Sequence, residues 1–370
     1  MKKNAVIQSQ SMVSMNSPQN GITTGGTQRY TVQLAKLLRQ KGYQVTIIAR
    51  AGVPCADFEI EEGRIIVVQA SLNRKGDYKY SKFIYDYCES NNADFVCYVD
   101  LMVAKYYCYP NSITLQHGIG WDGPLNLLQR VKRYITTRKY INVSRKFEHI
   151  ICVDTNYINW ARENDKRFFG NPGKYIYLPN FADESVFEYS YEEWNKDIEF
   201  VLLYPRRLVE YRGYDLFINM CEILKSKGYN IHPVLAFEEN ASDNYTGLFE
   251  NKKCNYEIIH PKLNEIASEY HRAFLTYVPT IWSEGTSLSA IEAICSGCPV
   301  ISSDVGGLGN IIIPGFNGDI VAPTVDSFVK ATEKVLANPQ LRNEWAKNCE
   351  LVKKSFLIKR WNEKMLEFIE

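Results

Sequence analysis

Two glutamates, Glu284 and Glu292, enclose a run of small residues that suits a phosphorylated, hydroxyl-rich ligand. The four residues after Glu284 are Gly285, Thr286, Ser287 and Leu288. Small side chains let backbone N–H groups approach an anion, and the helix predicted from residue 287 adds the positive end of its dipole. Glu292 lies within that helix, where its carboxylate can accept hydrogen bonds from both hydroxyls of a ribose, while Glu284 can meet a second polyol. Either carboxylate taken alone is also compatible with an ordinary surface acid.

Two arginines, Arg207 and Arg212, follow another predicted strand and supply the positive charge that a diphosphate requires. The sequence has no Asp-x-Asp pair, the short acidic element that commonly holds a divalent metal ion against a nucleotide diphosphate. Cationic side chains and a helix N-terminus must then neutralise a bound diphosphate. We therefore predict a reaction that needs neither a metal ion nor a cofactor.

These residues must be positioned by strands and helices. Along the whole chain, short β-branched or aromatic runs alternate with segments of helical periodicity, which is typical of a parallel α/β fold. The strands expected in the first half are 5–8, 45–49, 95–99, 113–116, 150–153 and 175–178. Those expected in the second half are 200–204, 231–235, 256–259, 274–277, 300–302 and 319–321. The loop from Glu284 to Ser287 then follows the carboxyl end of a parallel strand, where ligands collect in such sheets.

A chain of 370 residues is too long for one compact core, so we expect two similar α/β domains with a cleft between them. We place the first domain at 1–185 and the second at 186–350. Residues 351–370 are expected to form a C-terminal helix that packs back on the first domain.

The composition excludes several classes of protein. The hydrophobic content of 45%, the charged content of 23% and a formal net charge of +1 argue against a disordered chain and against non-specific nucleic-acid binding. The N-terminal apolar run is too short for a signal peptide, so we expect a cytoplasmic protein.

Most of the ten cysteines lie in apolar runs and are expected to be buried thiols. Cys295 and Cys298 form a C-x2-C pair without a second pair, which disfavours zinc.

The segment around Glu284 and Glu292 resembles the retaining glycosyltransferases of family 4, which have the GT-B fold of two Rossmann-like domains. That family carries two glutamates at this spacing, followed by the Gly-x-Pro-Val-Ile run found here at 297–301. Residues 206–213 resemble the family's Gly-Arg-Leu-x-x-x-Lys-Gly element, with arginine in place of both the first glycine and the lysine.

The resemblance extends to the first half of the chain. Gly25 and Gly26 are similar to the family's glycine loop, which lets the backbone approach the donor phosphates. His117 ends a predicted strand, precedes a glycine and matches the family's active-site histidine. A lone histidine is more often a structural residue, so both interpretations of His117 stay open.

The resemblance implies a hexosyltransferase that moves a sugar from a UDP or GDP sugar to a glycan, a lipid-linked or another acceptor with retention of configuration. Such an enzyme serves surface polysaccharide or glycoconjugate synthesis. Glu284 and His117 would hold the donor sugar, Arg207 and Arg212 the leaving diphosphate, and Glu292 the ribose. Gly25, Gly26 and the residues from 285 to 288 would complete substrate binding.

Two alternatives share the expected architecture. A catalytically silent, glycosyltransferase-like binding subunit is expected to have lost Glu284, Glu292 or the two arginines, and this chain retains them. The UDP-sugar 2-epimerases have the same two-domain shape, but they do not account for the two spaced glutamates.

One stretch, residues 130–146, contains seven bases and no acid. It is either a solvated helix face or a patch that attaches the protein to anionic lipid at the inner face of the membrane. The bases are Arg130, Lys132, Arg133, Arg138, Lys139, Arg145 and Lys146.

Overall fold

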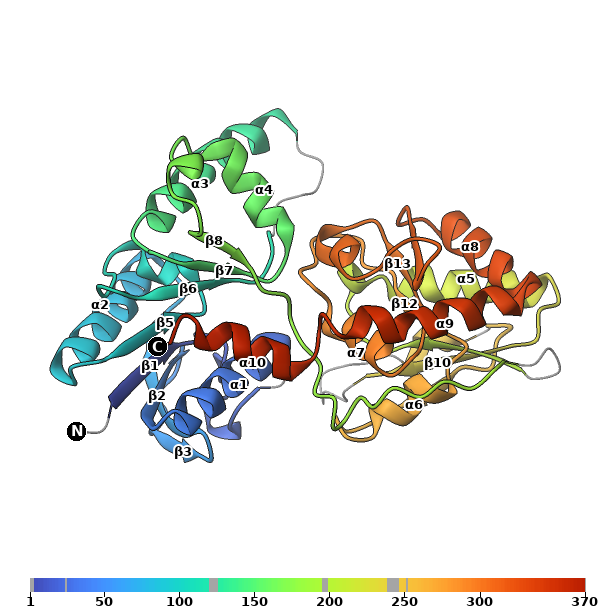
Figure 1. Ribbon diagram of the computed structural model, residues 1–370, viewed down its shortest axis with the longest axis horizontal. Helices are drawn as coiled ribbons and strands as arrows, with labels where there is room; N and C mark the ends of the chain where they lie inside the picture. Colours follow the sequence, from blue (N-terminus) through green and yellow to red (C-terminus); the bar gives the residue numbers. More distant parts are fainter. Residues whose placement is uncertain are drawn as a thin grey trace. The chain divides into compact units, whose positions relative to one another are not determined.

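A computed structural model describes residues 3–23, 25–119, 126–194, 199–237, 246–250 and 252–369. Its contacts divide the chain into two compact units, each an α/β layer structure (Figure 1). The N-terminal unit reaches Leu178 and takes in the chain again from Asn362, whereas the C-terminal unit includes Pro179 to Trp361.

The N-terminal unit contains an eight-stranded sheet in the order β3-β4-β2-β1-β5-β6-β7-β8. All neighbouring strands are parallel except β3 and β4. The strands are β1 (Lys3–Gln8), β2 (Tyr43–Ala51), β3 (Phe58–Ile60), β4 (Gly63–Gln69), β5 (Phe95–Tyr98), β6 (Ile113–Gln116), β7 (Ile150–Cys152) and β8 (Tyr175–Tyr177). The helices are α1 (Gly26–Gln40), α2 (Arg74–Ser90), α3 (Leu127–Ser144) and α4 (Thr155–Asn164).

The antiparallel pair β3 and β4 was not expected from the sequence. The two strands are joined by a turn of only two residues, Glu61 and Glu62. Because no helical segment separates β3 from β4, the alternation of strand and helix along the sequence does not reveal this hairpin. Gly63 begins β4 beside β2, and a Cβ at this position would lie 2.5 Å from the carbonyl oxygen of Val45. Glycine therefore lets β4 approach β2 closely enough to extend the sheet.

The C-terminal unit contains a six-stranded, wholly parallel sheet in the order β11-β10-β9-β12-β13-β14. Its strands are β9 (Phe200–Tyr204), β10 (Ile231–Ala236), β11 (Glu257–Ile259), β12 (Leu275–Val278), β13 (Val300–Ser303) and β14 (Gly318–Val321), each at its expected place. The helices of this unit are α5 (Tyr214–Ser226), α6 (Ile266–Arg272), α7 (Leu288–Cys295), α8 (Val325–Ala337) and α9 (Pro339–Lys353). The last helix, α10 (Ile358–Leu366), begins in this unit and from Asn362 belongs to the N-terminal unit.

The two unit boundaries differ from the expected residues 186 and 351. Residues 179–187 belong to the C-terminal unit because Asn180 binds Thr286 through two hydrogen bonds and Phe187 packs into that unit's core. The helix expected over 351–370 is not continuous: the range contains the end of α9, which packs within the C-terminal unit, and then α10. Only the chain from Asn362 joins the N-terminal unit, where Tyr43 donates a hydrogen bond to the carbonyl oxygen of Ile369 (3.2 Å).

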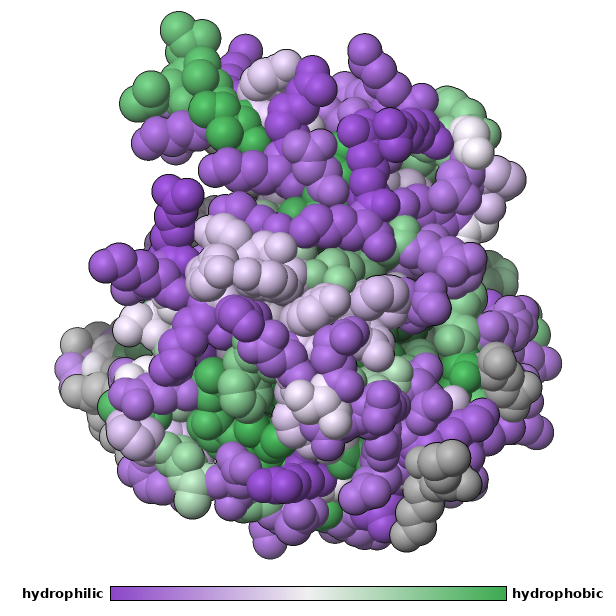
Figure 2. All heavy atoms as spheres, turned by 90° about the vertical axis from the view of Figure 1, so that its left-hand side faces the viewer, coloured by the Kyte–Doolittle hydropathy of each residue, from purple (hydrophilic) through white to green (hydrophobic). Residues whose placement is uncertain are grey.

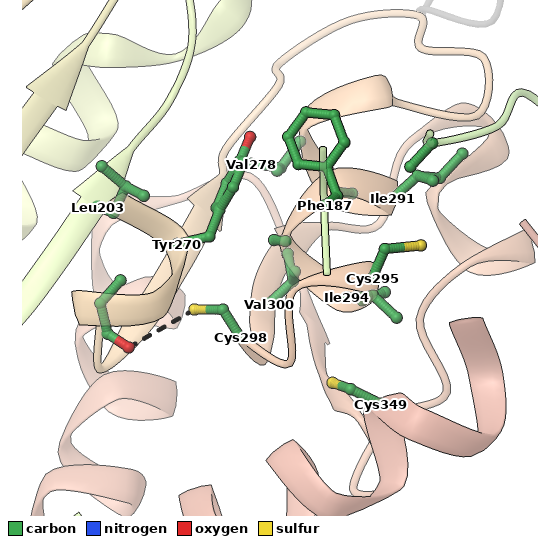
Figure 3. Close-up of a cluster of buried hydrophobic side chains, with 14 of the residues drawn as sticks. Phe187, Leu203, Tyr270, Val278, Ile291, Ile294, Cys295, Cys298, Val300 and Cys349 are labelled. Atoms are coloured by element: carbon green, nitrogen blue, oxygen red, sulfur yellow. Dashed lines mark hydrogen bonds between the residues drawn. The ribbon is translucent and has the colours of Figure 1, made fainter. Parts of the chain in front are cut away.

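One core of the C-terminal unit packs α7 against β12 and β13, and it contains Phe187, Tyr270, Ile291, Cys295 and Cys298 (Figure 3). All ten cysteines are free thiols, and eight of them are buried, as expected. Burial raises the pKa of Cys295 to about 12 and also raises that of Cys298, so both are protonated at neutral pH. None of the helices in the described ranges is both long and apolar enough to cross a membrane.

Candidate active site

Three loops meet at the carboxyl ends of β9, β12 and β13, which are neighbours in the sheet of the C-terminal unit. The loops comprise residues 205–213, 279–287 and 304–307. The first two are joined by a backbone hydrogen bond from Ile281 to Tyr211 (3.0 Å), and the last two by one from Gly307 to Glu284 (2.8 Å). The sheet therefore brings the two sequence motifs, residues 206–213 and 284–292, into one place.

Two glycines make this close approach of the loops possible. Gly213 has a φ of +74°, and a Cβ there would lie 1.8 Å from the carbonyl oxygen of Pro279. Gly306 has a φ of +59°, and a Cβ there would lie 2.0 Å from the carbonyl oxygen of Glu284. Any side chain at either position would push the Glu284 loop away from its neighbours.

The carboxylate of Glu284 lies at the centre of this arrangement. Its Oε2 accepts hydrogen bonds from Arg206 Nη2 (2.7 Å), from Thr280 Oγ1 (3.0 Å) and from Arg212 Nη1. Arg206 Nη1 also donates to Thr280 Oγ1 (2.6 Å). The side chains of Arg206 and Glu284 are only 7% and 9% exposed. The geometry fixes one carboxylate oxygen, whereas no donor among the described residues reaches Oε1.

The charges of this ion cluster, defined as Arg206, Arg212 and Glu284, stabilise one another. Burial alone would raise the pKa of Glu284, but the two arginines outweigh it and hold that pKa below its usual value. Burial tends to lower the pKa of Arg212, but the negative charge of Glu284 outweighs burial and raises the pKa of Arg212 above its usual value. Glu284 and Arg212 are therefore charged at neutral pH. Two guanidinium groups against one carboxylate leave the cluster with one net positive charge.

The arginine pair in this cluster differs from the pair expected from the sequence. Arg206 and Arg212 bind Glu284, whereas Arg207 is exposed and forms no ion pair with any described carboxylate. Arg206 and Thr280 were not expected at the site. The sequence contained a signal for Arg206, since a long cationic residue replaced a glycine there, but no pattern showed which of two adjacent arginines points inward.

The N-terminus of α7 combines buried polar groups with small residues. Thr286 is anchored within the unit, because its Oγ1 accepts a hydrogen bond from the backbone N–H of Asn180 (3.0 Å) and its carbonyl oxygen accepts one from Asn180 Nδ2 (2.6 Å). Ser287 precedes the helix, and its hydroxyl is buried without a hydrogen-bond partner in the part of the chain that the structure describes. Gly285 and Leu288 are half-buried. The N-terminus of α7 thus keeps the features of an anion site.

Glu292 lies on α7 and is 5% exposed. Its Oε2 accepts a hydrogen bond from the hydroxyl of Tyr270 on α6 (3.0 Å). Tyr270 was not expected from the sequence to contribute, because a buried tyrosine in a short helix has no motif of its own. The contact fixes the orientation of the Glu292 carboxylate, as a residue that binds two hydroxyls requires.

The remaining expected residues lie in the N-terminal unit. Gly25 precedes α1 and Gly26 begins it. His117 follows β6, and its ring makes an edge contact with Tyr30 of α1, with 5.3 Å between the ring centroids. Its Nε2 is buried and has no hydrogen-bond partner among the described residues. Burial lowers the pKa of His117 to about 4, so the imidazole is neutral at pH 7.

A carboxyl group that the sequence analysis missed, Asp100, follows β5 in the same unit. Its Oδ2 accepts a hydrogen bond from Gln8 Nε2 (3.3 Å), and its backbone N–H donates to Gln8 Oε1 (3.0 Å). Burial raises its pKa. An acid directly after an apolar strand is the sequence signal for this position.

Two family models together match most of the chain. The model of Glycosyltransferase Family 4 matches residues 24–186, and the model of glycosyl transferases group 1 matches residues 189–351. An uncharacterized glycosyltransferase of Methanocaldococcus jannaschii is 32% identical over 269 residues, which are 69% of this chain and 71% of that protein. The capsular polysaccharide biosynthesis glycosyltransferase CapM of Staphylococcus aureus is 27% identical over 224 residues, which are 59% of this chain but only 57% of that protein's length.

The solved structures with similar folds cover nearly the whole chain. Sucrose-phosphate synthase of Thermosynechococcus elongatus has a TM-score of 0.78 at 18% identity, and the superposition covers 99% of this chain and 98% of the synthase chain. HepE of Anabaena in complex with UDP-glucose has a TM-score of 0.69 at 14% identity and covers 98% of each chain. These likenesses confirm the expected GT-B fold of two Rossmann-like units. Matched in both halves by these family models, the chain belongs to the group 1, family 4 glycosyltransferases.

Proposed function

We propose that the protein transfers a sugar from a nucleotide diphosphate to an acceptor hydroxyl in the synthesis of a polysaccharide or other glycoconjugate. The observation that carries this proposal is the ion cluster, in which the buried Arg206 and the half-buried Arg212 fix one oxygen of Glu284 and leave Oε1 open. Family membership and the UDP-glucose in the HepE structure support a nucleotide-sugar donor. The name of CapM supports a polysaccharide product.

Each candidate group then has a distinct role. Glu292, oriented by Tyr270, binds the ribose hydroxyls. The N-terminus of α7 and the exposed Arg207 bind the diphosphate, and the net positive charge of the ion cluster adds to the field there. Glu284 accepts a hydrogen bond from a donor-sugar hydroxyl through Oε1. His117, neutral because it is buried, can donate or accept one hydrogen bond to the sugar without adding charge.

The reaction we propose proceeds on one face of the sugar and retains the anomeric configuration. The acceptor oxygen forms a bond to the anomeric carbon while the bond from that carbon to the diphosphate breaks. The acceptor proton passes to an oxygen of the departing phosphate. Positive charge develops on the sugar ring, close to the carboxylate of Glu284, and negative charge on the diphosphate is stabilised by the arginines and by α7, so no metal ion is required.

The test is a panel of UDP and GDP sugars, offered to the full chain with glycan and lipid-linked acceptors. A bound donor should stabilise the fold, by about 2.7 kcal/mol at 100 times its Kd. Formation of the glycoside together with release of nucleotide diphosphate supports the proposal, and NMR of the product anomer decides retention. Donor binding without transfer indicates a silent binding subunit, and conversion of the donor to its 2-epimer indicates an epimerase. Either of these outcomes would overturn the proposal.

A further inference from the structure

The first turns of α3 carry large apolar side chains that face away from the N-terminal unit. Between 50% and 80% of each of these side chains is exposed. They are Leu127, Leu128, Val131, Tyr134 and Ile135. At about 100° per residue they lie within an arc of about 120°, so they form one stripe, which we call the α3 stripe. Figure 2 shows hydrophobic side chains projecting among hydrophilic ones at the level of α3.

The opposite side of the helix attaches it to the unit. Arg133, Thr137 and Tyr140 are half-buried, and Ile141 and Ser144 are buried. Asn126 and Gln129 form a capping box at the start of the helix, which therefore begins with satisfied backbone donors. The α3 stripe is thus a stable feature of a folded helix and not part of a frayed end.

Basic residues lie on both sides of the stripe. On a helical projection Arg130 lies on one side, Lys132 and Lys139 lie on the other, and Arg138 follows one turn later. These four are exposed and form no ion pair with a carboxylate in the described ranges. Two of the other three bases of the 130–146 stretch have partners: Arg145 pairs with Asp165 (2.9 Å), and Lys146 donates to two backbone carbonyl groups. The third, Arg133, is half-buried on the opposite side of the helix.

An exposed apolar stripe with exposed bases on both sides, none of them in an ion pair with a described carboxylate, has the chemistry of a helix that lies in a membrane interface. We propose that α3 docks the protein on an anionic phospholipid bilayer, with the α3 stripe in the boundary between headgroups and acyl chains and the flanking bases on the lipid phosphates. A second copy of this chain is a poorer occupant, because two α3 helices face to face would bring eight unpaired bases together. This inference does not depend on the proposed sugar transfer.

Sedimentation of the full chain with vesicles tests the proposal. We expect binding to vesicles of phosphatidylcholine with phosphatidylglycerol and little binding to phosphatidylcholine alone. Replacing two flanking bases, Lys132→Gln with Lys139→Gln, should weaken binding about 25-fold at low salt, since each base near an anionic surface contributes about a fivefold change. Raising the salt concentration should reduce the difference. The charge-matched control, Lys225→Gln with Lys330→Gln, removes two exposed bases outside α3 and should bind as the wild type does.

The apolar stripe is tested separately. Leu128→Ser with Val131→Ser should abolish most of the binding while leaving the thermal unfolding temperature unchanged, because both side chains are exposed. Leu72→Ser with Leu351→Ser makes the same kind of change at exposed positions elsewhere and should have no effect. Equal binding to both vesicle types, unchanged binding of both α3 variants, or a dimer in solution that the α3 variants dissociate would overturn the proposal.

Discussion

Replacing Arg206 with methionine isolates the contribution of the ion cluster around Glu284. Arg206 donates to Glu284 Oε2 (2.7 Å) and to Thr280 Oγ1 (2.6 Å), and its side chain is 7% exposed. Methionine keeps an unbranched apolar stem of similar reach but removes the charge and both hydrogen bonds. Glu284 is left buried with Arg212 as its one cationic partner among the described residues.

The cost follows from the burial of the partner that remains. Removing one member of a buried ion pair destabilises a protein by about 3–5 kcal/mol, because the remaining charge stays out of water. Arg212 and Thr280 still reach the carboxylate, so we expect the lower end, about 3 kcal/mol. For a unit of 150–250 residues this corresponds to a fall in Tm of roughly 6–12 °C.

The adjacent arginine provides a matched control. Arg207→Met makes the same chemical change one residue away, at an exposed side chain, and should alter the free energy of unfolding by no more than about 0.5 kcal/mol. Both variants are measured by thermal and urea unfolding, and donor KM is determined for each. We expect Arg206→Met to lose stability and Arg207→Met to raise the donor KM. Equal stability losses, or a loss below about 1 kcal/mol for Arg206→Met, would refute the buried cluster.

The pH dependence gives an independent check of the same cluster. Burial tends to raise the pKa of Glu284, but Arg206 and Arg212 lower it below the value in the unfolded chain. The ionised group therefore contributes stability that is present above the ordinary glutamate pKa and is lost as the pH falls through the lower folded pKa. The stability advantage of the wild type over Arg206→Met should accordingly shrink on acidification below about pH 4.

Three further predictions concern the two glutamates, the need for a metal ion and the titration of His117. Glu292→Ala should raise donor KM about tenfold or more, because ribose contacts are equal in the ground and transition states. Glu284→Gln should mainly lower kcat, and the same kinetic pattern in both variants would contradict their assigned roles. Turnover should persist in EDTA, and activity that returns only with Mg²⁺ would exclude a metal-free reaction. Because the folded pKa of His117 is lowered by burial to about 4, stability should fall between pH 6.5 and 4, and His117→Gln should reduce that slope in urea unfolding.

The arrangement of strands could be predicted from the sequence because parallel strands are buried on both faces. Runs such as Phe95–Tyr98 and Ile150–Cys152 are continuous and mostly apolar, and helical segments separate the runs of the chain. The unit boundaries could not be predicted as well. Residues 179–187 have no strong periodicity, and their membership depends on contacts with distant residues, such as that of Asn180 with Thr286, more than a hundred positions away.

In the candidate site, too, the sequence spacing predicts some positions, whereas others depend on contacts between distant residues. The positions of Glu284 and Glu292 follow from the strand and helix that flank them, so the sequence predicts both glutamates at one end of the sheet. Which arginine reaches Glu284 depends on how the 205–213 loop turns after β9, and that turn is set by the left-handed Gly213 packed against Pro279.

The role of Arg206 could not be predicted from the local sequence, because it depends on tertiary contacts. Its position matters for the proposed chemistry. If only Arg212 held Glu284, the carboxylate would be free to rotate, and a sugar hydroxyl would have to compete with solvent to orient it. Arg206 and Thr280 fix Oε2 from a second direction, so Oε1 is presented in one orientation before substrate arrives. The additional arginine therefore acts as a positioning residue, and losing it should lower kcat more than it raises donor KM.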